Sequence, residues 1–392
     1  MMEIIEIQQS SDWALFHQVP HQIYSADPNY ISPIESDVEQ VFNPKKNKAF
    51  QHGSARCFVL LNQQQPIGRI AAFIDHERNE SNDFPVGGIG FFECINDANA
   101  AQILFDQAEQ YLLSWGVKAI DGPINFGERD RFWGLLVKGK KAPLYQENYQ
   151  PTYYQAFFEA NGYQPYEQIL TFHGEMDKVP IKRFSQIAKR VRERYGFYTK
   201  AMKTQKRIPL FARHFAQVYN VAFKDNPYFK PLEGAQVARI FKVMQPIADF
   251  RMIFITYESK KPVAFAGFIP DINPFLKKMN GRLKWYKLPG LLYKIRTTKS
   301  HLLKGIAFGI DPDYQRRGAF AELIDAIYND YTKQRYSDYY LATIRGHNTV
   351  MVNSISNLGV KVERVHLAYR KMLDNNLPLN PFEFMEIEEG MG

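Results

Sequence analysis

The stretch "IDPDYQRRGAF" (310–320) has residue types and a spacing that suit the binding of a phosphate group. It follows the apolar run "GIAFGI" and precedes the helical pattern "AELIDAIYNDYTKQ", so Gly318 stands where a strand turns into a helix. Backbone N–H groups at a helix N-terminus lack partners within the helix and lie at the positive end of its dipole, which favours anions. Gly318 lets the backbone approach a ligand closely, and Arg316 and Arg317 add charge for a second phosphate.

The same residues also fit an ordinary helix start, which needs only an N-cap. Asp311 or Asp313 could supply that cap. A single glycine does not distinguish a phosphate-binding loop from an ordinary helix start. The distinction has to come from the pattern of residues around it.

Three ionisable residues outside this stretch are candidates for proton transfer. Glu93 ends the apolar run "GGIGFFEC", where it would be a general base with a raised pKa or would point to solvent. Glu128 belongs to the charged segment "GERDRFW", which fits a loop that reads a polar substrate or a surface salt-bridge loop. His347, next to Asn348, is the third candidate, although a lone histidine is more often structural.

The segment 276–299 is strongly basic. It carries eight basic residues and no acidic ones, with Trp285, Tyr286 and Tyr293 interleaved. Basic and aromatic residues together suit RNA, or an amphipathic contact with an anionic membrane. A solvated flap over an acceptor groove explains the same composition.

The length, net charge and cysteine content of the chain limit the classes of protein to which it can belong. Its 392 residues exceed a typical single core, and the net charge of +8 suits an anionic partner such as a phosphorylated cofactor, nucleic acid or a membrane. Cys57 and Cys94 belong to no CxxC or Cys/His cluster, so neither a disulfide nor a metal site is expected. The first residues do not resemble a signal peptide and no apolar run has the length of a membrane span, so we expect a cytoplasmic protein.

The chain repeats its order of elements at about half its length. The run "PIGRIAAFID" (66–75) matches "PVAFAGFIPD" (262–271). Two further pairs follow in the same order: strand, loop and helix at 87–116 and 305–335, then helix, glycine and strand at 153–166 and 352–365. Duplication of one unit explains all three pairs, and two unrelated α/β domains with similar turns are the alternative.

These patterns predict an α/β (α+β) protein in three parts. The parts are a first unit at 1–180, a basic and mostly helical connector at 181–206, and a second unit at 207–392. Each unit runs helical start, two strands, strand–loop–helix, strand, helix and strand, which is typical of a mixed sheet flanked by helices.

The stretch 310–320 resembles the acyl-CoA-binding motif of the GNAT superfamily of N-acetyltransferases, Arg/Gln-x-x-Gly-x-Gly/Ala after a central strand. The matching positions are Pro312, Tyr314, Gln315 and Gly318, with Asn348 and Gly359 at the spacing of a second family feature. The resemblance covers 207–373 well and the first half in outline. It implies two tandem GNAT-like domains, each a mixed, mostly antiparallel sheet flanked by helices, the first of them degenerate.

The resemblance also implies a set of cofactor contacts for acetyl-CoA or another acyl-CoA. The backbone of 308–310 would pair with pantetheine, the loop 315–320 would hold the pyrophosphate, and Asn348 would lie near the cofactor arm. The residues in this set are Phe308, Gly309, Ile310, Gln315, Arg316, Arg317, Gly318, Ala319, Phe320 and Asn348.

The sequence departs from the family pattern at several positions. Phe320 replaces the last small residue of the motif, Ile355 stands where many members have a tyrosine acid, and "GIAFGI" has no glutamate base. The first half has "ECINDANAAQ" instead of a glycine loop, and there Asn96 or Asp97 has the character of a plain N-cap. The first half is therefore not expected to bind CoA.

The expected function is acyl transfer from acyl-CoA to a small-molecule or peptide amine held between the halves, by a monomer or homodimer. A backbone N–H of the central strand would polarise the thioester carbonyl. No candidate among Glu93, Glu128 and His347 is compelling as the acceptor of the ammonium proton. The alternatives are a Fem-like transferase that uses aminoacyl-tRNA and a non-catalytic protein that binds CoA or a partner.

Overall fold

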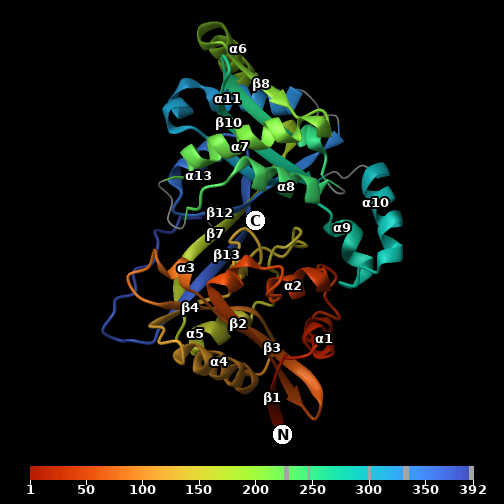
Figure 1. Ribbon diagram of the computed structural model, residues 1–392, viewed down its shortest axis with the longest axis vertical. Helices are drawn as coiled ribbons and strands as arrows, with labels where there is room; N and C mark the ends of the chain where they lie inside the picture. The colour runs from red at the N-terminus through yellow and green to blue at the C-terminus, as the bar shows by residue number, and fades with distance from the viewer. Residues whose placement is uncertain (225–228, 246–247, 299–301, 330–334, 388–392) are drawn as a thin grey trace.

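One mixed sheet runs through the whole molecule in the computed structural model, which describes residues 1–224, 229–245, 248–298, 302–329 and 335–387 (Figure 1). The 13 strands follow the order β1-β2-β3-β4-β5-β13-β7-β12-β11-β10-β9-β8, with β6 paired to β13. Neighbouring strands are antiparallel except at β4–β5 and β11–β12. The predicted mixed, mostly antiparallel architecture is therefore confirmed.

The first half of the chain supplies seven strands and five helices to the described structure. They are β1 (Met2–Glu6), α1 (Trp13–Ile23), α2 (Glu35–Val41), β2 (Gly53–Asn62), β3 (Gln65–Asp75), α3 (His76–Asn79), β4 (Val86–Cys94), α4 (Ala98–Leu113), β5 (Ala119–Gly122), β6 (Leu135–Lys138), α5 (Tyr154–Ala160) and β7 (Gln164–Glu175). Helices α1 and α2 pack on one face of this part of the sheet, and α4 and α5 on the other.

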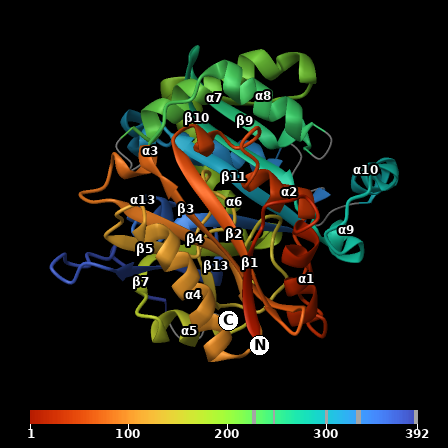
Figure 2. The same cartoon turned by 60° about the horizontal axis from the view of Figure 1, so that its bottom comes forward.

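The second half repeats this order. Its elements are α6 (Ile181–Tyr195), β8 (Phe197–Ala201), α7 (Ile208–Ala222), α8 (Gly234–Met244), β9 (Ile253–Glu258), β10 (Lys261–Pro270), α9 (Asn273–Leu276), α10 (Leu288–Thr297), β11 (Leu302–Ile310), α11 (Ala319–Ile327), β12 (Asp338–Arg345), α13 (Thr349–Ser356) and β13 (Lys361–Met372). Helices α7 and α8 cover one face, and α6, α11 and α13 the other (Figures 1 and 2). Residues 330–334 of the helix expected at 319–334 lie outside the described residues.

Helix α4 shows how the sequence fixes a local element. The Asp97 carboxylate accepts hydrogen bonds from the backbone N–H groups of Asn99 and Ala100, which satisfies the start of the helix. Apolar residues then recur every three or four positions from Ala100 to Leu112, and these are the residues that the helix buries against β3. Of the two residues expected as the N-cap, Asn96 and Asp97, the structure uses Asp97.

The two halves exchange their last strands. β7 lies between β12 and β13, and β13 lies between β5 and β7, and Figure 1 shows the two strands next to each other at the centre of the molecule. Leu170 and Phe172 of β7 consequently belong to the core of the second half, whereas Tyr369 of β13 is fully buried in the core of the first. The division at 1–180, 181–206 and 207–392 stays a prediction, and the cores cross it.

No helix in the described part of the chain combines the length and the apolar character that a membrane crossing requires.

Candidate functional site

Strands β11 and β12 separate halfway along their length. They pair in parallel from Leu302 with Asp338 to Gly305 with Leu341, and the ladder goes no further among the described residues. Both strands are irregular there: the pairing of β10 with β11 skips Ile306, and Thr343 of β12 has a positive φ of 61°. The edge of β11 that turns away from β10 therefore has no strand partner at 308–310 in the described part of the chain, and this is where the resemblance places pantetheine.

Helix α11 begins at the mouth of this separation. A short 3-10 turn (Pro312–Arg317) leads to Gly318, whose φ of 87° is left-handed, and α11 starts at the next residue. Asp311 accepts a hydrogen bond from the backbone N–H of Asp313 and so caps the 3-10 turn, while no side chain in the described structure caps α11. The first N–H groups of α11 thus remain for an anion.

Gly318 is also required by the packing of α6. A Cβ atom at this position would lie 2.7 Å from Cγ1 of Val191, a buried residue of α6. The side of Gly318 that a side chain would occupy therefore faces α6. Its role in approach to a phosphate stays a prediction.

The two arginines of the motif have different surroundings. The Arg317 guanidinium lies over the rings of Tyr195 and Tyr314, 4.7 and 4.8 Å from their centroids, and pairs with Glu258. Arg316 is exposed, and no ion pair joins it to another described residue. Arg316 is therefore the motif cation that is placed to meet a ligand from solvent, with exposed Gln315 beside it.

Phe320 and Asn348 have local structural partners. The Phe320 ring packs edge-on against Phe308 of β11 and Phe184 of α6. The Asn348 side chain accepts a hydrogen bond from the backbone N–H of Met351 and caps α13. Contact of either residue with a cofactor remains a prediction.

The first half lacks the corresponding opening. The backbone N–H of Ile124 binds the carbonyl of Ile89 at 2.8 Å, beyond the paired ends of β4 and β5, and a Cβ on Gly90 would lie 2.0 Å from the Ile124 carbonyl oxygen. The start of α4 is already satisfied by Asp97. Both observations support the expectation that only the second half holds the cofactor.

A buried polar cluster lies where the halves meet, beside the separation of β11 and β12. Lys304 is the residue of β11 directly before Gly305, and its ammonium donates to the Tyr145 carbonyl at 2.6 Å. Asp271 accepts from the Tyr145 backbone N–H at 3.1 Å. Glu147 pairs with Arg364 at 3.0 Å between Nε and Oε2. The cluster thus joins β10 and β11 to the 139–153 loop of the first half.

The charges of this cluster are shifted by burial and by one another. Burial lowers the pKa of Lys304 and raises the pKa of Asp271. Burial alone would raise the pKa of Glu147, but the guanidinium of Arg364 and the neighbouring cations outweigh it and lower the pKa to about 2. Lys304 therefore loses its proton more readily than an ordinary lysine does.

Glu93 occupies a second buried site, in the first half. Its carboxylate accepts hydrogen bonds from the hydroxyls of Tyr24 and Tyr154, both at 2.8 Å, and lies 3.7 Å from Arg69. Burial raises the pKa of Glu93. It borders a cavity of about 30 Å³, which Glu147 also lines. Glu93 therefore points inward, and its solvent-facing alternative is wrong.

Glu128 and His347 both lie near a group of arginines. Glu128 is exposed and pairs with Arg131 at 2.7 Å. Arg129 and Arg345 pair with buried Glu167 at 3.0 and 3.3 Å.

His347 stacks on Phe382 at 4.3 Å, and burial lowers its pKa. Its Nδ1 atom is buried without a hydrogen-bond partner among the described residues. The charged segment that contains Glu128 and Asp130 also approaches β12, because the Thr343 hydroxyl lies 3.5 Å from the Asp130 carbonyl. Catalytic roles for Glu93, Glu128 and His347 stay predictions.

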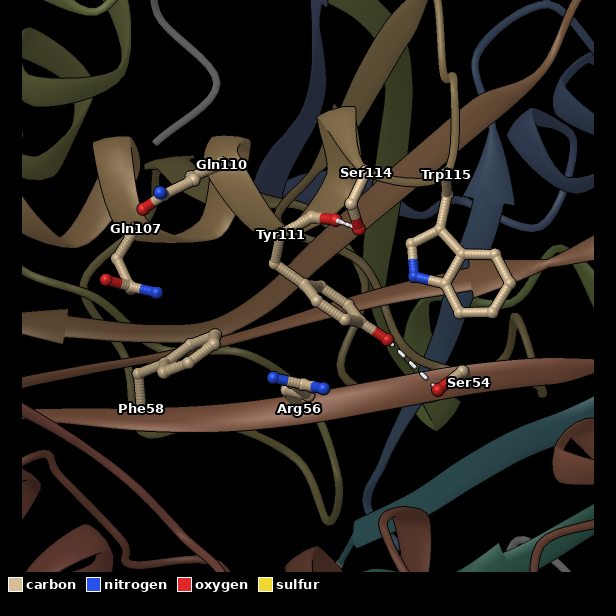
Figure 3. A pocket seen from close by; sticks show the side chains of 8 residues that line it. All are labelled: Ser54, Arg56, Phe58, Gln107, Gln110, Tyr111, Ser114 and Trp115. Carbon is tan, nitrogen blue, oxygen red and sulfur yellow. Dashed lines mark hydrogen bonds between the residues drawn. The ribbon is translucent and has the colours of Figure 1, made fainter.

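Two other features lie away from these clusters. His52, Asp75 and Glu77 have metal-type donor atoms within 4.8 Å of one another, but both ring nitrogens of His52 bond to the carboxylates and Lys230 pairs with Glu77. An open hollow of about 500 Å³ between β2 and α4 is shown in Figure 3. It is lined by Ser54, Arg56, Phe58, Gln107, Gln110, Tyr111, Ser114 and Trp115.

Lys304, Asp271 and Glu147 were not among the residues predicted from the sequence. Lys304 carried a usable signal, because it is a charged residue inside the apolar run "LLKGIAFGI". The positions of Asp271 and Glu147 had no local signal, since their partners come from distant parts of the chain.

Two curated proteins are similar to this chain over nearly its whole length. No family model matches the chain. The bacterial ceramide synthase of Caulobacter vibrioides is 22% identical over 95% of this chain and 98% of that protein, and protein YghO of Escherichia coli is 23% identical over 93% of each.

Solved structures show which fold the chain has. A tandem GNAT protein from the clavulanic acid biosynthesis pathway has a TM-score of 0.55 over 95% of this chain and 98% of that one, at 9% identity. A GCN5-related N-acetyltransferase from Sphaerobacter thermophilus has a TM-score of 0.53 over 96% and 98%, at 10% identity. The chain spans 38% of a fungal multi-domain β-N-acetylglucosaminidase with a glucosamine N-acetyltransferase region, with a TM-score of 0.55.

Proposed function

We infer acyl transfer from the tandem GNAT-like fold that the chain shares with its structural neighbours. We propose that it is an acyl-CoA-dependent N-acyltransferase whose second half holds the acyl donor. The observation that carries this proposal is the separation of β11 and β12 beside the uncapped start of α11, because the first half has neither feature. Gln315, Arg316 and the N–H groups of α11 would hold the pyrophosphate, and the free edge at 308–310 the pantetheine.

The reaction exchanges a thioester for an amide. The C–S bond of the acyl group breaks as the amine nitrogen forms a C–N bond, and the CoA sulfur leaves as a thiolate. The nitrogen loses a proton to a base, and that proton then converts the thiolate to the thiol. We assign Lys304 as the base, because it borders the separation of β11 and β12 and burial lowers its pKa. Glu93 and His347 are the alternative candidates for this role. A protein base must be unprotonated to act, which a lowered pKa favours.

The proposed acceptor is the amine of a long-chain amino alcohol. The near full-length similarity to a protein named bacterial ceramide synthase supports this choice, since a ceramide is an N-acylated amino alcohol with a long chain. The acceptor would lie between the halves, where Lys304 meets the 139–153 loop.

The test is turnover of acetyl-CoA and palmitoyl-CoA with sphinganine, followed by thiol release and by mass spectrometry of the amide. The expected product is N-acyl-sphinganine. Lys304→Met should lower kcat by about 10² or more, with little change in KM for acyl-CoA. Glu93→Gln and His347→Asn, measured in parallel, show which candidate the reaction needs.

The outcomes separate the alternatives. Binding of CoA without turnover of any amine would favour a non-catalytic CoA-binding protein. Transfer from aminoacyl-tRNA and not from acyl-CoA would favour the Fem-like alternative and contradict the proposal. A kcat of Lys304→Met within twofold of the wild-type value would remove the role assigned to Lys304 while leaving acyl transfer intact.

A further inference from the structure

A basic arm, residues 276–298, stands away from the sheet between β10 and β11. Both views show its helix α10 projecting from the body of the molecule (Figures 1 and 2). One side of the arm is anchored on the first half: Leu291 and Ile295 belong to an apolar cluster with Ile31 and Ile34. Arg282 also pairs with Glu35 at 3.2 Å. The arm therefore has a fixed inner side and a free outer side.

The exposed side chains of the arm include aromatic, aliphatic and positively charged ones. Tyr286, Leu288 and Tyr293 are 56%, 37% and 70% exposed. The exposed lysines of the arm are Lys278, Lys284, Lys287 and Lys294, together with Lys277, whose ammonium donates to the Pro28 carbonyl of the first half at 2.6 Å. Within the described structure no ion pair joins these lysines to an acidic side chain, and the sequence 276–298 contains no Asp or Glu. The surface is thus positive and partly apolar, with no internal compensation.

We propose that this arm docks the protein on the anionic headgroups of a lipid bilayer. Lysines near an anionic surface each add about fivefold to the affinity. Tyrosine and leucine side chains gain by entering the boundary between headgroups and acyl chains. Leu288 favours a bilayer over RNA, because an aliphatic side chain gains nothing from phosphates or stacked bases.

The position of the arm connects this contact with the junction of the halves. The arm leaves the sheet at Asp271 and Asn273, both buried, and the Asn273 side chain donates to the Pro143 carbonyl at 2.7 Å. Asp271 belongs to the cluster of Lys304. A docked arm would bring that junction to the membrane surface, where a lipid amine is available. Docking itself does not depend on the proposed acyl transfer.

The test is co-sedimentation of the full chain with vesicles of phosphatidylcholine alone or of an equal mixture with phosphatidylglycerol. The wild type is expected to sediment with the mixed vesicles, less so at high salt, and not with neutral vesicles. Lys284→Glu with Lys287→Glu should weaken this binding by about thirtyfold or more. Lys45→Glu with Lys46→Glu, exposed lysines of the first half, is the matched control and should keep it.

A second pair of variants tests the apolar contribution. Leu288→Ser with Tyr293→Ser should release the protein from mixed vesicles at high salt, whereas Leu113→Ser, 54% exposed on α4, should not. Equal binding by the wild type and the Lys284/Lys287 variant would overturn the proposal. So would absence of wild-type binding to mixed vesicles, or binding to polyuridylate in its place. Each result is read without acyl-CoA, so the outcome is separate from that of the proposed reaction.

Discussion

Lys304 stands at the point where the two parts of the candidate site meet. Its backbone belongs to the last paired stretch of β11, and its side chain reaches the first half through the Tyr145 carbonyl at 2.6 Å. A lysine in this position is costly to bury as a cation, and Asp271 and Glu147 offset part of that cost. The residue therefore has the burial and the partners of a functional group rather than those of a surface lysine.

The pair of Glu147 with Arg364 leads to a prediction about acid stability. The folded-state pKa of Glu147, about 2, lies below the usual 4.5, so its ionised form stabilises the fold above about pH 4.5 and this contribution is lost as the pH falls toward 2. Glu147→Gln should lower the free energy of unfolding by about 3 kcal/mol at pH 7. The difference from the wild type should shrink near pH 3, as measured by urea titration at both pH values.

A surface pair provides the control for this prediction. Glu175 pairs with Lys178 at the surface, and their side chains are 41% and 61% exposed, so Glu175→Gln should cost less than about 1 kcal/mol. A loss below 1 kcal/mol for Glu147→Gln, or one that does not change with pH, would show that the buried pair does not stabilise the protein.

At the scale of elements, α6 holds the start of α11. Arg192 of α6 pairs with Glu322 at 2.7 Å and also with Asp325, and Val191 fills the space beside Gly318. The helix within the predicted connector therefore packs directly on the predicted phosphate loop. A ligand at the start of α11 would be coupled to the position of α6.

Gly318→Ala is predicted to destabilise the protein for two reasons. The left-handed φ of 87° costs a residue with a Cβ about 1–2 kcal/mol, and the new Cβ would lie 2.7 Å from Val191. Gly196→Ala is the matched control, because Gly196 ends α6 with a φ of 67° and has no atom within 4 Å of its Cβ position. Thermal unfolding should show a larger loss for Gly318→Ala, and Val191→Ala should restore part of it. Equal losses for the two glycines would contradict the contact with α6.

The helices and strands were more predictable from the sequence than the distant segments that they contact. The N-cap of α4 was narrowed to Asn96 or Asp97 because a cap is a local feature, and the structure uses Asp97. The strand and helix order in both halves was predictable for the same reason. The exchange of β7 and β13 was not predictable, since a period-two apolar pattern shows that a strand is buried and not which neighbour it has. Lys304 and Asp271 escaped notice for a related reason: both reach Tyr145, more than a hundred residues away along the chain.

At the scale of the whole molecule, the exchanged strands make the halves interdependent. Residues 1–180 alone would lack β13, the partner of β5, and 181–392 alone would lack β7, the partner of β12. Each fragment should therefore fail to fold, whereas co-expression should give a one-to-one complex in size-exclusion chromatography. A single fragment with a cooperative unfolding transition would show that its half is an independent domain.

The central claim is that the second half holds acyl-CoA at the separation of β11 and β12. The most direct measurement is calorimetric titration of CoA and acetyl-CoA into the wild type, Arg316→Glu and the charge-matched control Lys45→Glu. The account predicts one site per chain in the wild type and the control, weakened about tenfold or more in Arg316→Glu, because a charge-assisted contact with phosphate is replaced by repulsion. Absence of binding to the wild type, or equal binding by all three proteins, would contradict it.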